Sequence, residues 1–276
     1  MKKHTVILFS ITTIFLLMGG LMTSCKKTPG GTSGTDSGTF LFHLHTQIVD
    51  STIGGNTDGA DSNTTGSSNL SPWYNDALGR RIKLTVPQFF ISGVVLENAN
   101  GTSLTLNNVA ILKGLDSEDY YICKVPIGTY TSAKFTVGLS TATNQLPPTT
   151  LFITDGIPYP AEASMWMGST TQGYYGMIVQ GAYDTAGTGI DPVPFNFEIP
   201  NSLTTATQVS LPTRGTPAYP VYVLTAGGTQ YIHVLCDYGQ LLAGIVNLKT
   251  NNSTTVNASL ADSLASYIPN MFRYEE

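Results

Sequence analysis

The run from Val86 to Gly101 constrains the fold of this chain more than any other stretch. It is rich in β-branched and aromatic residues, and it is almost continuously apolar between Phe89 and Leu96. This composition is typical of a strand that is covered on both faces. Asn100-Gly101 separates it from an alternating run, Thr102 to Leu112, and both turn residues tolerate the positive φ of a tight hairpin. We therefore expect a central strand that forms one arm of a β-hairpin.

Short strand-like runs recur along the rest of the chain. They are Phe40–Val49, Tyr120–Val125, Thr129–Leu139, Met165–Met167, Tyr174–Tyr183, Val193–Ile199, Tyr219–Leu224 and Thr229–Asp237. Gly227-Gly228 predicts a hairpin between the last two. Only the tail has a helical period, with Leu260, Leu264 and Ile268 four residues apart. The pattern predicts an all-β fold, a β-sandwich of about ten short antiparallel strands with a short C-terminal helix, over residues 40–276.

The N-terminus has the pattern of a lipoprotein signal peptide. Basic Lys2 and Lys3 precede an apolar stretch that is too short for a typical membrane span, and small residues lead to Cys25. We expect residues 1–24 to be a signal peptide and Cys25 to be lipidated. Residues 25–39, rich in glycine, serine and threonine, would form a flexible tether. The predicted location is the cell envelope, with the protein anchored to the membrane by lipid, at the periplasmic face of the outer membrane.

The composition narrows the class of partner. Only 11% of residues are charged and the formal net charge is −5, a profile typical of an exported β-rich protein. No basic cluster follows the N-terminus, which excludes nucleic acid as an expected partner. The chain has no Gly-x-Ser-x-Gly elbow, no phosphate-binding glycine loop with lysine and no His-Glu-x-x-His. We therefore expect a binding protein and not an enzyme.

Two histidines and a few further side chains are candidate metal ligands. His43 and His45 lie two residues apart in a strand, so they project from one face about 7 Å apart. Imidazole is the commonest metal ligand in proteins, and two imidazoles can hold a copper or zinc ion when a neighbouring strand supplies a third ligand. His233, Trp166 and Met165 are the further candidates. The alternative is that the histidines decorate a solvated face and the methionines fill core gaps.

Cys123 and Cys236 both lie in strand-like runs on faces that are expected to point inward. In an oxidising compartment they could form a disulfide. The alternative is two buried free thiols that act as small apolar side chains.

Several segments together resemble the MbnP-like domain, a copper-associated periplasmic family linked to methanobactin operons and also found as lipoproteins. The resemblance covers about residues 40–272. The segments are Phe42-His43-Leu44-His45, Tyr74 to Gly79, Phe89 to Leu96 with Asn100-Gly101, Val125 to Tyr130, Phe135 to Gly138, Met165-Trp166-Met167 ahead of Gly173-Tyr174, and the helical Ala261 to Phe272.

This resemblance implies a β-sandwich and, in characterised members, copper(I) held by histidine and by a tryptophan oxidised to kynurenine. It also implies a diheme, MauG-like partner for that oxidation. The family often shows two tryptophans shortly before its Gly-Tyr pair, whereas this chain has Trp166 followed by Met167 and a longer spacing. Because the family that this chain resembles is associated with copper, copper is the expected cofactor. The competing hypothesis is a structural lipoprotein, or one that binds a glycan or a partner protein without metal.

Overall fold

The structure is a computed structural model that describes residues 36–48, 73–76, 78–114, 119–148, 151–154, 157–160, 163–217, 219–245 and 247–275. The predicted signal peptide, Cys25 and most of the predicted tether lie outside these residues. In the part of the chain that is described, no helix combines the length and the apolar character needed to cross a membrane.

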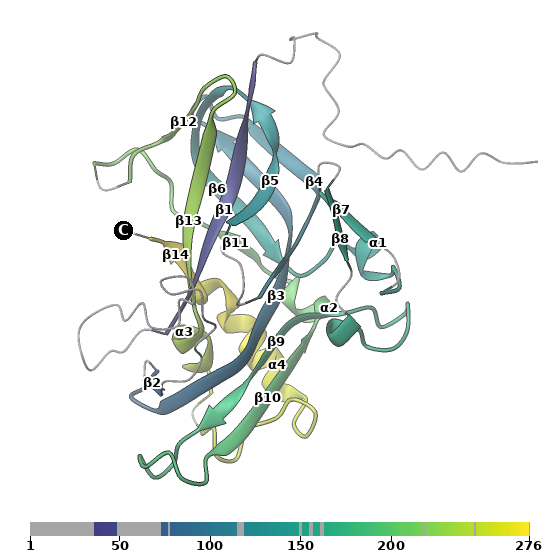
Figure 1. Cartoon of the computed structure of the whole chain (residues 1–276), viewed down its shortest axis with the longest axis vertical. Coiled ribbons are helices and arrows are strands. Elements are labelled where there is room, and N and C mark those ends of the chain that lie inside the picture. Colours follow the sequence, from purple (N-terminus) through teal and green to yellow (C-terminus); the bar gives the residue numbers. More distant parts are fainter. Residues whose placement is uncertain are drawn as a thin grey trace, which may run out of the picture.

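The described chain is built mainly from strands (Figure 1). The strands are β1 Ser37–Gln47, β2 Tyr74–Asn75, β3 Arg81–Asn98, β4 Ser103–Lys113, β5 Asp119–Pro126, β6 Gly128–Val137, β7 Leu151–Thr154, β8 Ile157–Pro160, β9 Tyr175–Tyr183, β10 Val193–Pro200, β11 Gln208–Ser210, β12 Tyr222–Leu224, β13 Thr229–Asp237 and β14 Phe272–Tyr274. The helices are α1 Thr141–Asn144, α2 Asn201–Thr204, α3 Tyr238–Leu242 and α4 Ser259–Tyr267, with 3-10 turns η3 Ala163–Met165 and η4 Ile268–Met271.

Two sheets carry the domain. One has four strands in the order β14-β13-β1-β5. The other has eight, with β10-β9-β3-β6-β11 as its main path, β12 paired with β6, and β2 and β4 paired with β3. Strands β7 and β8 form a separate pair. Apart from the parallel pair of β1 and β13, the strand pairs are antiparallel, and Figure 1 shows β13, β1 and β5 crossing in front of the larger sheet.

The core lies between the two sheets, as the sandwich prediction requires. Every second residue of β1 faces inward and is buried. Phe40 packs edge-to-face on Tyr130 of β6 at a ring-centroid distance of 5.1 Å, and Phe42 packs on Phe135 at 5.4 Å. Such edge-to-face pairs add to the free energy gained by burying the rings. These contacts confirm the all-β sandwich.

The central strand predicted from Phe89 to Leu96 is confirmed as part of β3. Its first half pairs with β9 and its second half with β6, while β4 pairs with it through the expected hairpin. Phe89 belongs to the main core, whereas Phe90 faces a second apolar cluster on the other side of the sheet. Both faces are therefore covered. In the turn only Gly101 has a positive φ, of 83°, so the turn is not a two-residue primed one.

Two local predictions are wrong. Met165–Met167 is not a strand, because Met165 ends a 3-10 turn and Trp166 makes only an isolated bridge to Tyr174. The run from Tyr219 to Asp237 is not a hairpin either, since β12 pairs with β6 and β13 pairs with β1 in the other sheet. Strands β12 and β13 each pair with a longer strand, and the two pairs lie in different sheets. This tertiary pairing overrides the local turn signal of Gly227-Gly228.

Candidate metal centre

His43 and His45 lie on the outer face of β1. The strand alternates between buried and partly exposed residues along its length, and both histidines occupy partly exposed positions. Their inward neighbours Phe42 and Leu44 are fully buried. Burying the apolar face of the strand therefore forces both imidazoles onto the opposite face, as the alternation predicts.

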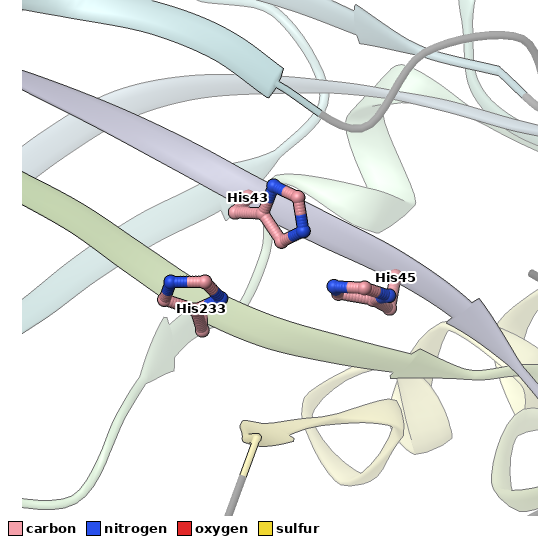
Figure 2. Close-up of side chains that lie close together, drawn as sticks. All are labelled: His43, His45 and His233. Carbon is pink, nitrogen blue, oxygen red and sulfur yellow. The ribbon is translucent and has the colours of Figure 1, made fainter. Parts of the chain in front are cut away.

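His233 reaches the same face from the neighbouring strand. Strand β13 runs parallel to β1 in a register that places His233 directly beside His43. The ring centroids of His43 and His45 are 4.3 Å apart, and those of His43 and His233 are 4.8 Å apart. Figure 2 shows the three rings on the two adjacent strands, close together on one side of the sheet.

These residues, His43, His45 and His233, form what we call the histidine triad. One ring nitrogen from each can be chosen so that all three lie within 4.8 Å of one another. Among the described residues this is the group of histidine, cysteine and acidic side chains that could hold a metal ion. Three converging imidazoles are a donor set that suits copper and zinc.

The electrostatics of His233 favour its neutral form. Partial burial lowers the pKa of His233 from its usual value, and the nearby His43 lowers it further, against the opposing effect of Glu275. A metal ligand must present an unprotonated nitrogen, so a lowered pKa favours metal binding at neutral pH.

Glu275 is a site residue that the sequence analysis missed. Its Oε2 lies 3.1 Å from Nδ1 of His233 and 3.4 Å from Nε2 of His45. Its backbone N–H donates to the carbonyl of His233 at 3.3 Å, which continues the pairing of β14 with β13 past Tyr274. The alternation Phe272-Arg273-Tyr274-Glu275 was the available signal, but it follows the helical segment directly and is too short to predict a strand.

A polar cluster next to the triad ties β14 to β13. Arg273 donates through Nη1 to the buried carboxylate of Asp237 at 3.1 Å and through Nη2 to Oε1 of Gln47 at 2.8 Å. All three residues belong to the strands that carry the triad and Glu275. This cluster holds the strand of Glu275 in register with the strand of His233.

A family model described as MbnP matches residues 58–258, which is more than half of the chain. The chain belongs to the MbnP family. The matched range contains His233 but ends before Glu275 and begins after His43 and His45, so the triad combines residues from inside and outside it.

Among solved structures, the chain is similar to MbnP from Methylosinus trichosporium. The two share 13% sequence identity, the match covers 75% of this chain and 77% of that one, and the TM-score is 0.34. No curated protein sequence matches the chain.

In this MbnP-family chain, Trp166 and Met165 do not join the histidines. Met165 is fully buried in the second apolar cluster with Phe90 and Tyr174, and the Trp166 ring packs on Tyr174 at 4.8 Å. That cluster lies at the eight-stranded sheet, whereas the triad is on the outer face of the four-stranded one. The prediction of Met165 and Trp166 as further ligands is therefore wrong, because neither belongs to the sheet that carries the triad.

Cys123 and Cys236 are both buried, and neither forms a disulfide. Cys123 pairs with Phe40 on one side of β1, and Cys236 pairs with Thr46 on the other. Six residue steps along the strand separate these positions by about 20 Å, whereas a disulfide needs Cα atoms less than about 7 Å apart. The Cys123–Cys236 disulfide is thus not formed. Burial raises the pKa of the Cys236 thiol to about 12, which makes it unreactive.

A shallow hollow of about 270 Å³ opens beside the triad. Its lining residues are Arg214, Tyr222, Gln230, Tyr231, His233 and Glu275. The side chain of His233 is 48% exposed and that of Glu275 is 35% exposed. An ion can therefore reach these two side chains from solvent without any movement of the sheet.

Proposed function

We propose that this MbnP-family protein binds a transition metal, with copper the first candidate, through His43, His45 and His233. The observation that carries the proposal is the parallel register of β1 and β13, which brings a third imidazole to two that already share a face. Family membership supports copper in particular, since the resemblance described above links these proteins to copper.

The donor set fits copper in part. Imidazole binds both Cu⁺ and Cu²⁺, so the triad can hold either state. A kynurenine ligand derived from Trp166 does not fit, because that side chain packs on Tyr174 at the other sheet. The proposal is therefore a histidine centre, and a diheme, MauG-like partner is not required to create any of its ligands.

The proposed role is binding and delivery at the cell envelope, with no catalytic step. The tether and the lipid at Cys25 would hold the domain at the membrane, which matches a protein that captures metal ions in the periplasm. Two or more acyl chains anchor a protein stably to a membrane, and the lipidated cysteine of a lipoprotein carries at least two. Changing Cys25→Ser should move the protein from the membrane fraction to the soluble fraction. Its retention in the membrane fraction would contradict the anchor.

Metal binding is tested directly on the full chain, purified in detergent after expression with added copper. We expect near-stoichiometric metal by elemental analysis and a rise in melting temperature on adding Cu²⁺ or Zn²⁺ to the metal-free protein. The double variant His43→Ala, His45→Ala and the single variant His233→Ala should each lose both effects.

The matched control is Tyr231→Phe. Its ring lies on the same face of β13, 5.9 Å from His233 and 6.2 Å from His43, and the change removes only a hydroxyl. It should bind metal like the wild type. Wild-type protein that takes up no metal, or histidine variants that bind as well as the control, would refute the proposal and favour the competing metal-free role as a structural, glycan-binding or partner-binding lipoprotein.

A further inference from the structure

We propose that Glu275 is the fourth ligand of the centre and that its carboxylate makes the site select divalent ions, Cu²⁺ or Zn²⁺, over Cu⁺. This inference rests on the proposed function of the histidine triad. It adds a residue that lies outside the range matched by the family model and gives the centre a mixed nitrogen and oxygen character.

The first step concerns the distances. Metal–ligand bonds of about 2.0–2.1 Å in a tetrahedral centre separate neighbouring donor atoms by about 3.3 Å. Oε2 of Glu275 lies 3.1 Å from Nδ1 of His233 and 3.4 Å from Nε2 of His45. Both oxygen–nitrogen distances suit neighbouring ligands of one ion, and the shorter one is a hydrogen bond between Glu275 and His233 in this structure. His43 lies beside both of the other rings, and its nitrogen completes the group of three that lies within 4.8 Å without Glu275. The Glu275 side chain would therefore move toward His43 when it becomes the fourth ligand.

The second step is that the fold positions this carboxylate. Strand β14 turns Phe272 and Tyr274 into the core, where Phe272 packs on Phe89 at 5.5 Å. Alternation then places Arg273 and Glu275 on the outer face with the triad. The N–H of Glu275 bonds to the carbonyl of His233, so the two residues are held side by side through the backbone.

The third step is the chemistry of the donors. Carboxylate oxygen is a hard, negatively charged ligand, whereas Cu⁺ prefers soft sulfur donors. The methionine that the sequence offered for a soft site, Met165, is buried in another cluster. The negative charge of a carboxylate attracts a doubly charged ion more strongly than a singly charged one. A centre of three neutral imidazoles and one carboxylate therefore favours a divalent ion. Among the common divalent metals, affinity for such a site rises to Cu²⁺ and then falls at Zn²⁺.

The test compares wild type with Glu275→Gln in the full-length chain. The amide keeps the size and the hydrogen-bonding ability of the side chain but is a much poorer metal ligand. Affinities are measured by competition for Zn²⁺, Cu²⁺ and chelator-buffered Cu⁺. We expect the affinity for Zn²⁺ and Cu²⁺ to fall about tenfold or more, and the affinity for Cu⁺ to stay close to that of the wild type.

The matched control is Glu97→Gln. Glu97 is 29% exposed, close to the 35% of Glu275, and it also pairs with a basic residue, Lys134, but on the other sheet. It should leave all three affinities unchanged. Melting temperatures of the metal-free variants check that each is folded.

A spectroscopic measurement separates a ligand from a residue that only orients a histidine. The visible absorption bands of Co²⁺ report the ligands and their geometry. At saturating Co²⁺ we expect the bands of Glu275→Gln to differ from those of the wild type in position and intensity. Identical bands, or equal losses of affinity for Cu⁺ and Zn²⁺, would overturn the assignment of Glu275 while leaving the triad intact. Absence of metal from the wild type would instead refute the proposed function itself.

Discussion

Replacing Asp237 is the sharpest test of how the fold holds together the strands of the proposed metal centre. Its carboxylate is fully buried, and it accepts hydrogen bonds from two backbone N–H groups and from Arg273. The N–H groups of Gly239 and Gln240 donate to Oδ1 at 2.9 and 3.3 Å, so Asp237 caps the start of α3. Nη1 of Arg273 donates to Oδ2 at 3.1 Å and ties in β14. Asp237 is the last residue of β13, and its side chain links that strand to the start of α3 and to β14, the strand that precedes Glu275.

The expected cost can be worked from these contacts. Loss of a helix N-cap costs about 1 kcal/mol. A hydrogen bond to a charged partner is worth about 1.5–3 kcal/mol when buried, but the Arg273 side chain is 38% exposed, so solvent screening reduces the ion pair to about 1 kcal/mol. Asp237→Ala should therefore lower the free energy of unfolding by about 2 kcal/mol.

For a domain of this size each kcal/mol shifts the melting temperature by about 2–4 °C. Asp237→Ala should then melt roughly 4–8 °C below the wild type. Asp237→Asn keeps an oxygen that can cap the helix and loses the charge, so its shift should be about half as large. The assay is thermal unfolding of metal-free protein followed by circular dichroism. Asp237→Ala should also weaken metal binding, because β14 would hold Glu275 less firmly.

Asp262→Ala is the matched control, since it removes a carboxylate from an exposed position in the first turn of α4. It should change the melting temperature by no more than about 2 °C. The account of Asp237 as both helix cap and ion-pair partner is refuted by either of two results. One is that Asp237→Ala has the same melting temperature as this control, and the other is that Asp237→Asn lowers the melting temperature as much as Asp237→Ala.

Three further predictions follow from the packing. Gly181→Ala should lower the free energy of unfolding by about 2 kcal/mol or more, as measured by urea denaturation. The reason is that an added Cβ would lie 2.0 Å from the carbonyl oxygen of Lys83. Unchanged stability would contradict the close pairing of β9 with β3. Cys123 and Cys236 should resist thiol reagents in the native protein and both react after denaturation without reductant, as followed by intact mass; a protein that needs reductant first would contradict the free thiols. Trp166→Phe should leave the affinity for Zn²⁺ and Cu²⁺ unchanged in the competition assay, since its ring lies in the second apolar cluster; a clear loss of affinity would contradict its exclusion from the centre.

The position of Trp166 bears on how this chain relates to its family. The resemblance implies a copper site that includes an oxidised tryptophan, but here Trp166 packs in the second apolar cluster, against the eight-stranded sheet, whereas the triad lies on the four-stranded one. The proposed histidine centre therefore contains no ligand derived from tryptophan.

Much of the fold could be predicted because its signals are local. The alternation in Phe40 to Gln47 assigns His43 and His45 to one face whatever the strand pairs with, since burial of Phe40, Phe42 and Leu44 decides which face is inward. The continuous apolar run of β3 likewise requires cover on both faces. Strand existence, facing and the class of fold therefore follow from period and composition alone.

What only the tertiary structure decided is which strands become neighbours. His233 reaches His43 because β13 pairs in parallel with β1, across most of the chain, and no local pattern encodes that partner or its register. Met165 and Trp166 have suitable chemistry but pack in the second apolar cluster, against the other sheet, and the cysteines lie on opposite sides of β1. The sequence by itself determined which side chains point outward as candidate ligands. Strand pairing, which depends on contacts summed over the whole core, determined that three histidines and Glu275 meet.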